Sequence, residues 1–388
     1  MPNHRAFVKF RWQIVALLFL SINVLFYLLN FRVDVNVDNA FYDSDSARTL
    51  SYVYEPRNAI SSVRPMLYLF SWIPHLLSKV VSPYIAWTSV TLFLLSFIIH
   101  SVFKIFGNRS FDFYPALLVF VNNAVLSWIF VPDTFVLGSA AYIFAIRLYT
   151  GGSKYWRVIS SGILASCFNL FLIIPWMVAH IYLGRDELKK TLSRAIQVAL
   201  LTILMAATSQ FFAKFKPVDI SPIASSLLPS RITGKALPLI ANNGFLSSIQ
   251  SLGWIHSPVP GAIKNSITYL VSPWTFGYHY SSEFGAIQSP LFPPLILILG
   301  VGVSMLSFFG IVIMRVEYPR FTVFAGSLEA ATCMLYLFYS THPVLFAPFL
   351  FVTRIPGLIY FIRKKLSLLY PLLFLLTVLN IWSFYLVY

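Results

Sequence analysis

Acidic side chains gather in one short stretch of this chain. Of 13 acidic residues in 388, five follow the first long apolar run: Asp34, Asp38, Asp43, Asp45 and Glu55. Asp43 and Asp45 are two residues apart, so in a turn both carboxylates can reach one cation, and carboxylate oxygens suit Mg²⁺ or Mn²⁺. Either carboxylate can instead act as a general base on an acceptor hydroxyl. The alternative is a solvated loop whose Asp and Ser cap a helix over residues 46–55.

Four more ionisable residues stand in or beside apolar segments. Asp133, in Val-Pro-Asp-Thr-Phe, is either a second acidic site or the N-cap of a helix that starts at Thr134. Glu329 lies inside an apolar run, and His342 follows in Tyr-Ser-Thr-His-Pro. A carboxylate within a membrane is a functional candidate by default, but both residues could instead satisfy polar groups between packed helices. Arg354 is a further buried charge, which either snorkels or faces a lipid phosphate.

Basic residues on the loops are the candidates for binding a phosphate. Arg64, in Ser-Ser-Val-Arg-Pro, either binds phosphate, together with Arg48 and Arg57, or pairs with the neighbouring acids. The long hydrophilic segment 214–290 adds Arg231, Lys235 and Lys264 as candidates for binding a pyrophosphate or a sugar. The sequence has no glycine-rich phosphate loop, no Gly-x-Ser-x-Gly, no His-Glu-x-x-His and no Cys-x-x-Cys, so no nucleotide cofactor is expected.

The composition requires that lipid surrounds these residues. Hydrophobic residues make up 58% of the chain and charged residues 11%, with a mean hydropathy of +0.76, whereas a soluble domain carries roughly 25% charged residues. The net charge of +15 would indicate nucleic acid in a soluble protein, but here the basic excess of cytoplasmic loops explains it. Cys167 and Cys333 lie far apart in apolar segments and imply no disulfide or metal motif. We therefore expect an all-α polytopic membrane protein with no nucleic-acid partner.

Apolar segments give the expected crossings, because a helix needs about 20 apolar residues to span a bilayer. The expected spans are 12–30, 84–103, 113–131, 132–149, 192–213, 291–314, 321–340, 344–361 and 367–386. Segment 158–184 has Asn169 and Pro175 near its middle and is expected to form two short helices that go out and return. No small-residue cleavage site follows Asn30, so the first helix is expected to stay uncleaved.

Six basic clusters orient these helices, since cytoplasmic loops are rich in Lys and Arg. The clusters are Arg5/Lys9/Arg11, Lys104/Arg109, Arg147/Lys154/Arg157, Arg185/Lys189/Lys190/Arg194, Arg315/Arg320 and Arg363/Lys364/Lys365. All six face the cytoplasm if helix pairs leave and return between them, which gives about eleven crossings and a cytoplasmic N-terminus. Loop 31–63, the turn at Asp133, the apex near Asn169, loop 214–290 and the turn at 340–342 then lie outside.

This arrangement constrains the two long loops. Segment 65–81, with Pro74 and Lys79, must be an interfacial or re-entrant helix, the alternative being a full crossing with misplaced charges. Residues 31–83 then form a first external loop with juxtamembrane helices. Loop 214–290 is long enough to contain short helices of its own. Residues 244–256 and 260–272 are the candidates for short helices lying on the surface. The whole chain, 1–388, is expected to be one transmembrane domain.

The layout and several short strings resemble the GT-C superfamily of integral-membrane glycosyltransferases, which includes protein O-mannosyltransferases and aminoarabinose transferases. A first helix precedes an acidic loop (Asp43-Ser-Asp45-Ser-Ala-Arg), and Ser-Val-Arg64-Pro-Met-Leu-Tyr-Leu-Phe follows. Pro-Asp133-Thr-Phe stands where many members have Pro-Glu-Thr-Phe, and Tyr-Ser-Thr-His342-Pro is similar to a polar turn before a late helix. The chain departs from the family in lacking a large soluble C-terminal domain and in its Asp-x-Asp pair.

The resemblance implies transfer of a sugar from a polyprenyl-phosphate donor to an acceptor hydroxyl of a lipid, glycan or protein on the extracytoplasmic side. Asp43 or Asp45 would be the base or a metal ligand, and Asp133 the second acidic position, near the metal or the carrier phosphate. Arg64, or basic residues of the long loop, would hold that phosphate. Such an enzyme belongs to the cell envelope, and we expect a bacterial plasma membrane rather than the endoplasmic reticulum.

Two other classes of protein fit the same composition. A transporter or flippase of a lipid-linked or amphipathic solute would place polar groups and broken helices near the midplane in paired halves. Here the acids cluster at one face and no internal repeat is apparent. A non-catalytic membrane subunit that positions a partner is the third class.

Overall fold

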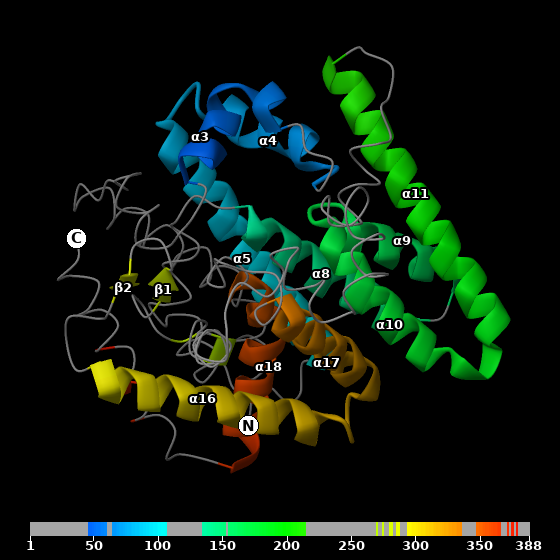
Figure 1. The fold of residues 1–388 in the computed structure, drawn as a ribbon, viewed down its shortest axis with the longest axis vertical. Helices are drawn as coiled ribbons and strands as arrows, with labels where there is room; N and C mark the ends of the chain where they lie inside the picture. Colours follow the sequence, from blue (N-terminus) through cyan, green and yellow to red (C-terminus); the bar gives the residue numbers. More distant parts are fainter. Residues whose placement is uncertain are drawn as a thin grey trace, which may run out of the picture.

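The computed structural model describes residues 46–59, 64–106, 134–152, 154–214, 293–335 and 347–365, together with 269–270, 274, 279–281, 285–287 and the single positions 371, 374, 375 and 378. This part of the chain is mostly helical (Figure 1). Its described strands are β1 (His279–Ser281) and β2 (Gly285–Ile287), which pair as a short antiparallel ribbon. The all-α prediction is therefore confirmed at the level of fold class.

The helices of the first half are α3 (Ser46–Tyr54), η1 (Pro56–Ala59), α4 (Leu67–Leu77), α5 (Pro83–Phe106), α8 (Phe135–Thr150), α9 (Tyr155–Ser166), η2 (Leu170–Leu172), α10 (Ile173–Leu183), η3 (Arg185–Glu187) and α11 (Leu188–Lys214). Those of the second half are α16 (Pro293–Met314), α17 (Pro319–Met334) and α18 (Ala347–Lys365). Helices thus occupy the predicted spans 84–103 and 192–213, and they occupy the described parts of 291–314, 321–340 and 344–361 and nearly all of the described part of 132–149. The predicted spans 12–30 and 113–131, and nearly all of 367–386, lie outside the described residues.

The predicted break in segment 158–184 is confirmed. Helix α9 ends at Ser166, and α10 begins at Ile173 after the turn of η2. Asn169 has an extended backbone, and its side-chain oxygen accepts a hydrogen bond from the Phe171 N–H at 3.0 Å, which caps η2. Pro175 falls in the first turn of α10, where no intrahelical donor is needed. At 12 and 11 residues, neither helix is long enough to span a bilayer alone.

The predicted short helix within 65–81 is α4, and it has 11 residues. Since a bilayer core needs about 20, α4 is too short for a full crossing. Leu67, Ser71 and Pro74 form its buried face. The His75 imidazole lies 2.8 Å from the Val53 carbonyl oxygen, which ties α4 to α3. The opposite face is apolar and exposed, with Trp72, Ile73 and Leu76 all more than 40% accessible.

Helices α8, α9 and α10 are joined by two hydrogen bonds and one pair of stacked rings. The Trp176 indole N–H donates to the Ser161 hydroxyl at 3.1 Å, and Trp176 stacks on His180. His180 Nδ1 lies 3.0 Å from the Tyr149 hydroxyl. These contacts hold the α9–α10 pair against the end of α8.

Helix α16 lies across α18 (Figure 1), and two glycines mark the crossing. A Cβ added at Gly310 would overlap the backbone of Gly357, and one at Gly357 would overlap the Ser307 carbonyl oxygen. Small residues of this kind let two helix backbones touch, as is common in membrane proteins.

Three basic clusters gather at one end of the bundle, which we call the basic end. The Tyr155 hydroxyl donates to Gln197 at 2.6 Å and Arg194 lies over the Tyr155 ring, which joins the start of α9 to α11. Tyr149, at the end of α8, contacts Phe324, near the start of α17, with ring centroids 4.8 Å apart. The clusters around Arg147, Arg194 and Arg320 are therefore neighbours, although they are far apart in sequence.

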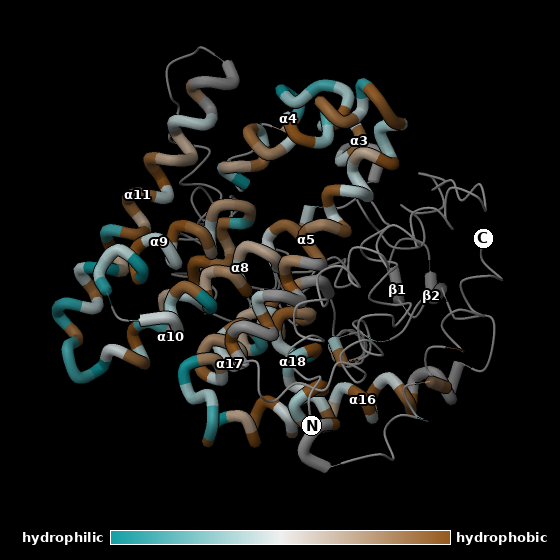
Figure 2. The backbone as a smooth tube through the Cα atoms, turned by 180° about the vertical axis from the view of Figure 1, so that it is seen from behind, coloured by the Kyte–Doolittle hydropathy of each residue, from teal (hydrophilic) through white to brown (hydrophobic). Residues whose placement is uncertain are grey.

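The outer surface of the bundle is strongly apolar. Along α11, Leu192, Ile196, Leu200 and Leu204 recur every four residues and are 41–61% exposed. Figure 2 shows hydrophobic residues along α11 and α16, while hydrophilic ones gather at the turn between α10 and α11. Among the described residues one helix, Arg185–Ser209, is long and apolar enough to cross a membrane, and several shorter apolar helices accompany it.

Residues of the predicted external loop 214–290 enter the core. Tyr269 is 8% exposed and packs with Leu350 and Phe308, and Trp274 is fully buried within the main hydrophobic core. The expectation that 260–272 would lie on the surface is therefore wrong for Tyr269. Its hydroxyl and backbone find polar partners inside the bundle, so burial leaves them satisfied.

Candidate functional site

Of the nine candidate site residues, two lie in the part of the chain that the structure describes, Arg64 and Glu329. The other seven lie outside it and keep their roles as predictions: Asp43, Asp45, Asp133, Arg231, Lys235, Lys264 and His342. The structure does, however, place the residues that flank several of them.

Arg64 lies against the first turn of α8. Its guanidinium carbon is 5.1 Å from the centre of the Phe135 ring, and Phe135 is the second residue after Asp133. Arg64 is half-buried, and among the described residues no carboxylate pairs with it. The structure therefore brings one predicted phosphate-binding residue beside the helix start that follows a predicted acidic residue.

The break between α9 and α10 reaches the same place. The backbone N–H of Met66, two residues after Arg64, donates to the Cys167 carbonyl at 2.9 Å. Phe70 of α4 packs edge-on against Phe168, with ring centroids 5.3 Å apart. The turn that precedes α4 is thus fixed by the apex predicted near Asn169.

The start of α18 completes this group. Phe349 contacts Phe135 at 5.4 Å and Phe171 at 6.2 Å between ring centroids. We call the group formed by Arg64, Phe135, Phe168 and Phe349 the rim. It joins the start of α8, the apex between α9 and α10, the turn before α4 and the start of α18, at the end of α8 opposite the basic end.

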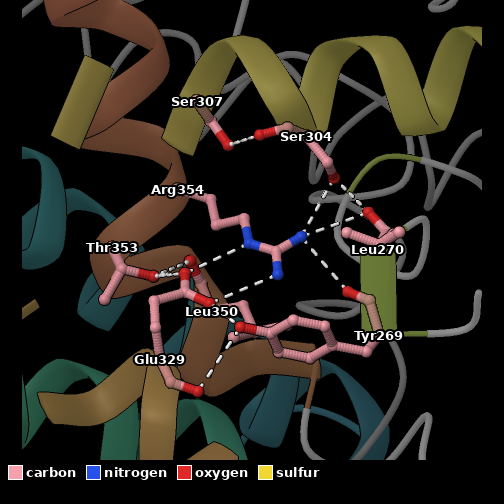
Figure 3. A network of polar contacts seen from close by, with 8 residues as sticks. All are labelled: Tyr269, Leu270, Ser304, Ser307, Glu329, Leu350, Thr353 and Arg354. Atoms are coloured by element: carbon pink, nitrogen blue, oxygen red, sulfur yellow. Dashed lines mark hydrogen bonds and ion pairs between the residues drawn. The ribbon is translucent and has the colours of Figure 1, made fainter. Parts of the chain in front are cut away.

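Glu329 lies away from the rim, in a buried polar network between α16, α17 and α18 (Figure 3). Its Oε1 accepts from Arg354 Nε at 3.1 Å and its Oε2 from Arg354 Nη2 at 3.2 Å, so the ion pair is bidentate. The Thr353 hydroxyl donates to Oε1 and the Tyr269 hydroxyl to Oε2. Each carboxylate oxygen therefore has two donors.

Arg354 is fully buried and has partners on every side. Its Nη1 donates to the carbonyl oxygens of Tyr269 and Leu270, both at 3.1 Å, and to the Ser304 hydroxyl at 2.9 Å. The guanidinium also lies against both the Tyr269 and the Phe308 rings, 4.5 and 4.3 Å from their centres. Arg354 thus neither snorkels nor faces a lipid phosphate, because its donors are directed at the protein.

These contacts favour the structural alternative for Glu329. A carboxylate with four donors and 8% side-chain exposure is poorly placed to bind a metal or accept a substrate proton. The described ranges hold no group of three or more His, Cys, Asp or Glu side chains that could hold a metal. The residues predicted as metal ligands lie outside those ranges.

The sequence contained a signal for the Glu329–Arg354 pair, but the two residues were interpreted one at a time. Glu329 and Arg354 are opposite charges in consecutive apolar spans, and charges inside a membrane usually pair. Tyr269 had no such signal, because it is 60 residues from Glu329 and lies in a loop.

Comparisons with protein-family models, with curated proteins and with solved structures found no match to this chain.

Proposed function

We propose that this chain is an integral-membrane glycosyltransferase that moves a sugar from a polyprenyl-phosphate donor to an acceptor hydroxyl on the extracytoplasmic side. The observation that carries the proposal is the rim. There Arg64, which follows the acidic loop, lies against Phe135, which follows Asp133. Arg64 and the residue that flanks Asp133, two positions that the resemblance assigns to one active site, thus meet at one end of the bundle, which supports the proposal.

The distribution of charge and apolar surface supports a membrane location for the chain. An exposed apolar stripe such as that on α11 is rare in soluble proteins. The basic end joins three of the clusters expected in the cytoplasm, and the rim lies at the opposite end of α8. We therefore propose the predicted arrangement of about eleven crossings within one transmembrane domain, with the rim outside, in a bacterial plasma membrane.

The path of the chain fits this arrangement. Helices α5 and α8 run in the same direction, since Trp87 shares a cluster with Leu137 and Phe97 contacts Phe144 at 4.9 Å. Two parallel helices require a return connection between them, which is where the crossing 113–131 is predicted. Helices α9 and α11 are parallel as well, as their contacts at Gly162–Val198 and Ser166–Thr202 show.

The proposed chemistry needs a cation at the leaving phosphate and a base at the acceptor. Arg64 would stabilise the negative charge that develops on the departing polyprenyl phosphate. Asp43 or Asp45 would accept the proton of the acceptor hydroxyl. Alternatively, Asp43, Asp45 and Asp133, which lie outside the described residues, would hold Mg²⁺ or Mn²⁺.

A binding measurement tests the role of Arg64. The full chain in nanodiscs is titrated with a polyprenyl phosphate and followed by native mass spectrometry. Arg64→Ala should weaken binding about 10- to 100-fold, which is the loss of one charged hydrogen-bonding group. The matched control is Arg185→Ala, which removes the same charge from an exposed position on η3 at the basic end and should bind normally.

A transfer assay tests the reaction itself. Membranes that contain the chain are supplied with polyprenyl-phosphate sugars carrying a radiolabel, and product formation is measured. Asp43→Asn and Asp45→Asn should reduce transfer while the melting temperature stays unchanged. Full transfer by both variants and by Arg64→Ala would reject the proposal.

One feature favours a transporter or flippase as the second candidate. The pair α9–α10 is a hairpin of two short helices with a polar residue, Asn169, at its apex, and transporters often build their binding sites from short or interrupted helices. Purified protein that moves a polyprenyl-phosphate sugar across vesicles without transferring the sugar would establish this second function.

A further inference from the structure

Part of the long loop is held deep inside the bundle by its backbone. Tyr269 and Leu270 are helical residues that lie among α16, α17 and α18, and Trp274 is buried in the main core. Ser304, which contacts Leu270, is the twelfth residue of α16, so this contact is about 16 Å along the helix at 1.5 Å per residue. Loop backbone at such a depth is tolerated only where protein groups satisfy it.

Arg354 and Ser304 provide the hydrogen-bond donors for this backbone. One guanidinium nitrogen donates to the carbonyl oxygens of both Tyr269 and Leu270, and the Ser304 hydroxyl donates to the Leu270 carbonyl (Figure 3). The guanidinium also stacks on the Tyr269 ring. A neutral side chain of similar size could not make these contacts, which explains why a charge lies at this depth.

Glu329 holds the arginine and the loop together. Its two oxygens fix the guanidinium plane, and Oε2 also accepts from the Tyr269 hydroxyl. Tyr269 is therefore held through its backbone by α18 and through its side chain by α17. An ion pair that served only to join α17 and α18 would need no contact with the loop.

We propose that Arg354 is a positioning residue that anchors loop 214–290 inside the bundle and thereby limits where the donor-binding residues of that loop can lie. This inference rests on the proposed function where it concerns Lys264, which precedes Tyr269 by five residues. Five residues of extended chain reach at most about 18 Å, so an anchored Tyr269 would limit how far from it Lys264 could lie. The anchor itself does not depend on which reaction the chain performs.

Hydrogen–deuterium exchange of the full chain in nanodiscs tests the anchor without an activity assay. In the wild type, the peptide that covers 265–275 should exchange slowly. Arg354→Met should raise its exchange rate at least about tenfold, because the two carbonyls lose their donor. Arg320→Met is the matched control, since it removes an exposed arginine from α17 at the basic end and should leave this peptide unchanged.

A double variant distinguishes loss of the anchor from misfolding of the whole chain. Arg354→Met alone leaves Glu329 buried without its counter-ion. Combining Glu329→Met with Arg354→Met removes both charges, so the double variant should fold. The double variant should keep a melting temperature near that of the wild type and still show fast exchange at 265–275. Slow exchange in this folded double variant would overturn the proposal, because the loop would then hold its place without the pair.

A kinetic measurement separates the anchor from the proposed reaction. If the chain transfers sugar, the double variant should raise KM for the donor several-fold with a smaller change in kcat. The reason is that the substitutions displace the loop but do not alter the proposed catalytic acids, Asp43 and Asp45. An unchanged KM together with fast exchange would overturn the proposed effect on donor binding through Lys264. It would not affect the conclusion that Arg354 anchors the loop. Absence of any transfer in the wild type would count against the proposed function and leave the exchange result intact.

Discussion

Glu329 and Arg354 show how two buried charges can be accommodated by a single network. Each would be costly alone, but the bidentate pair, two hydroxyl donors and two loop carbonyls satisfy nearly every polar atom. Buried pairs of this kind contribute little net stability compared with apolar side chains, yet breaking one partner is strongly destabilising. The pair therefore serves mainly to position the loop residues Tyr269 and Leu270, and it contributes little to the net stability of the bundle.

At the residue scale, we predict that Glu329→Gln destabilises the protein by about 3–5 kcal/mol, because it leaves the Arg354 charge buried without its counter-ion. Denaturant unfolding in detergent micelles measures the change. Pairing Glu329→Gln with Arg354→Met should recover most of the loss, since no charge then remains in the core. If the single variant is as stable as the wild type, the pair is not an ion pair in solution.

At the element scale, the crossing of α16 and α18 depends on two glycines. Gly310 and Gly357 face each other so closely that a methyl group on either would overlap backbone atoms of the opposite helix. Backbone cannot rotate away as a side chain can, so the helices would have to separate. Arg354 is three residues before Gly357, and a separation would also pull it from Ser304.

We therefore predict that Gly310→Ala lowers stability by about 1–3 kcal/mol or more through overpacking. Gly302→Ala is the matched control, because it lies on the same helix and a Cβ there meets nothing within 4 Å. That control should be neutral or slightly stabilising, as alanine favours helix over glycine. Thermal unfolding of both variants in the same detergent is the measurement. Equal melting temperatures for the two would show that the helices do not touch at Gly310.

Element positions were largely predictable, because an apolar run of a given length is a local property of the chain. The runs at 84–103, 192–213 and 291–314 correspond to α5, α11 and α16, and Asn169 with Pro175 correctly indicated the break between α9 and α10. The burial of Tyr269 was not predictable, because it depends on Arg354, which is 85 residues further along.

At the scale of the whole molecule, the basic end and the rim should lie on opposite sides of the membrane. Single cysteines at Asn58, near the rim, and Lys189, at the basic end, are both exposed and suit labelling in a Cys167→Ala/Cys333→Ala background. A membrane-impermeant maleimide should label position 58 in intact cells and position 189 only after permeabilisation, as the positive-inside rule requires. Labelling of both positions from one side would contradict the proposed topology.

The sequence by itself determined that this chain is mostly helical and where most of the described helices lie, and it predicts a lipid environment. Composition and the length of apolar runs suffice for that, because they act within one segment at a time. Only the tertiary structure decided that Arg64 meets the start of α8, that Glu329 and Arg354 neutralise each other and that Tyr269 is drawn into the core. Such contacts join residues 25 to 85 positions apart, so helix packing, which no local pattern encodes, sets them.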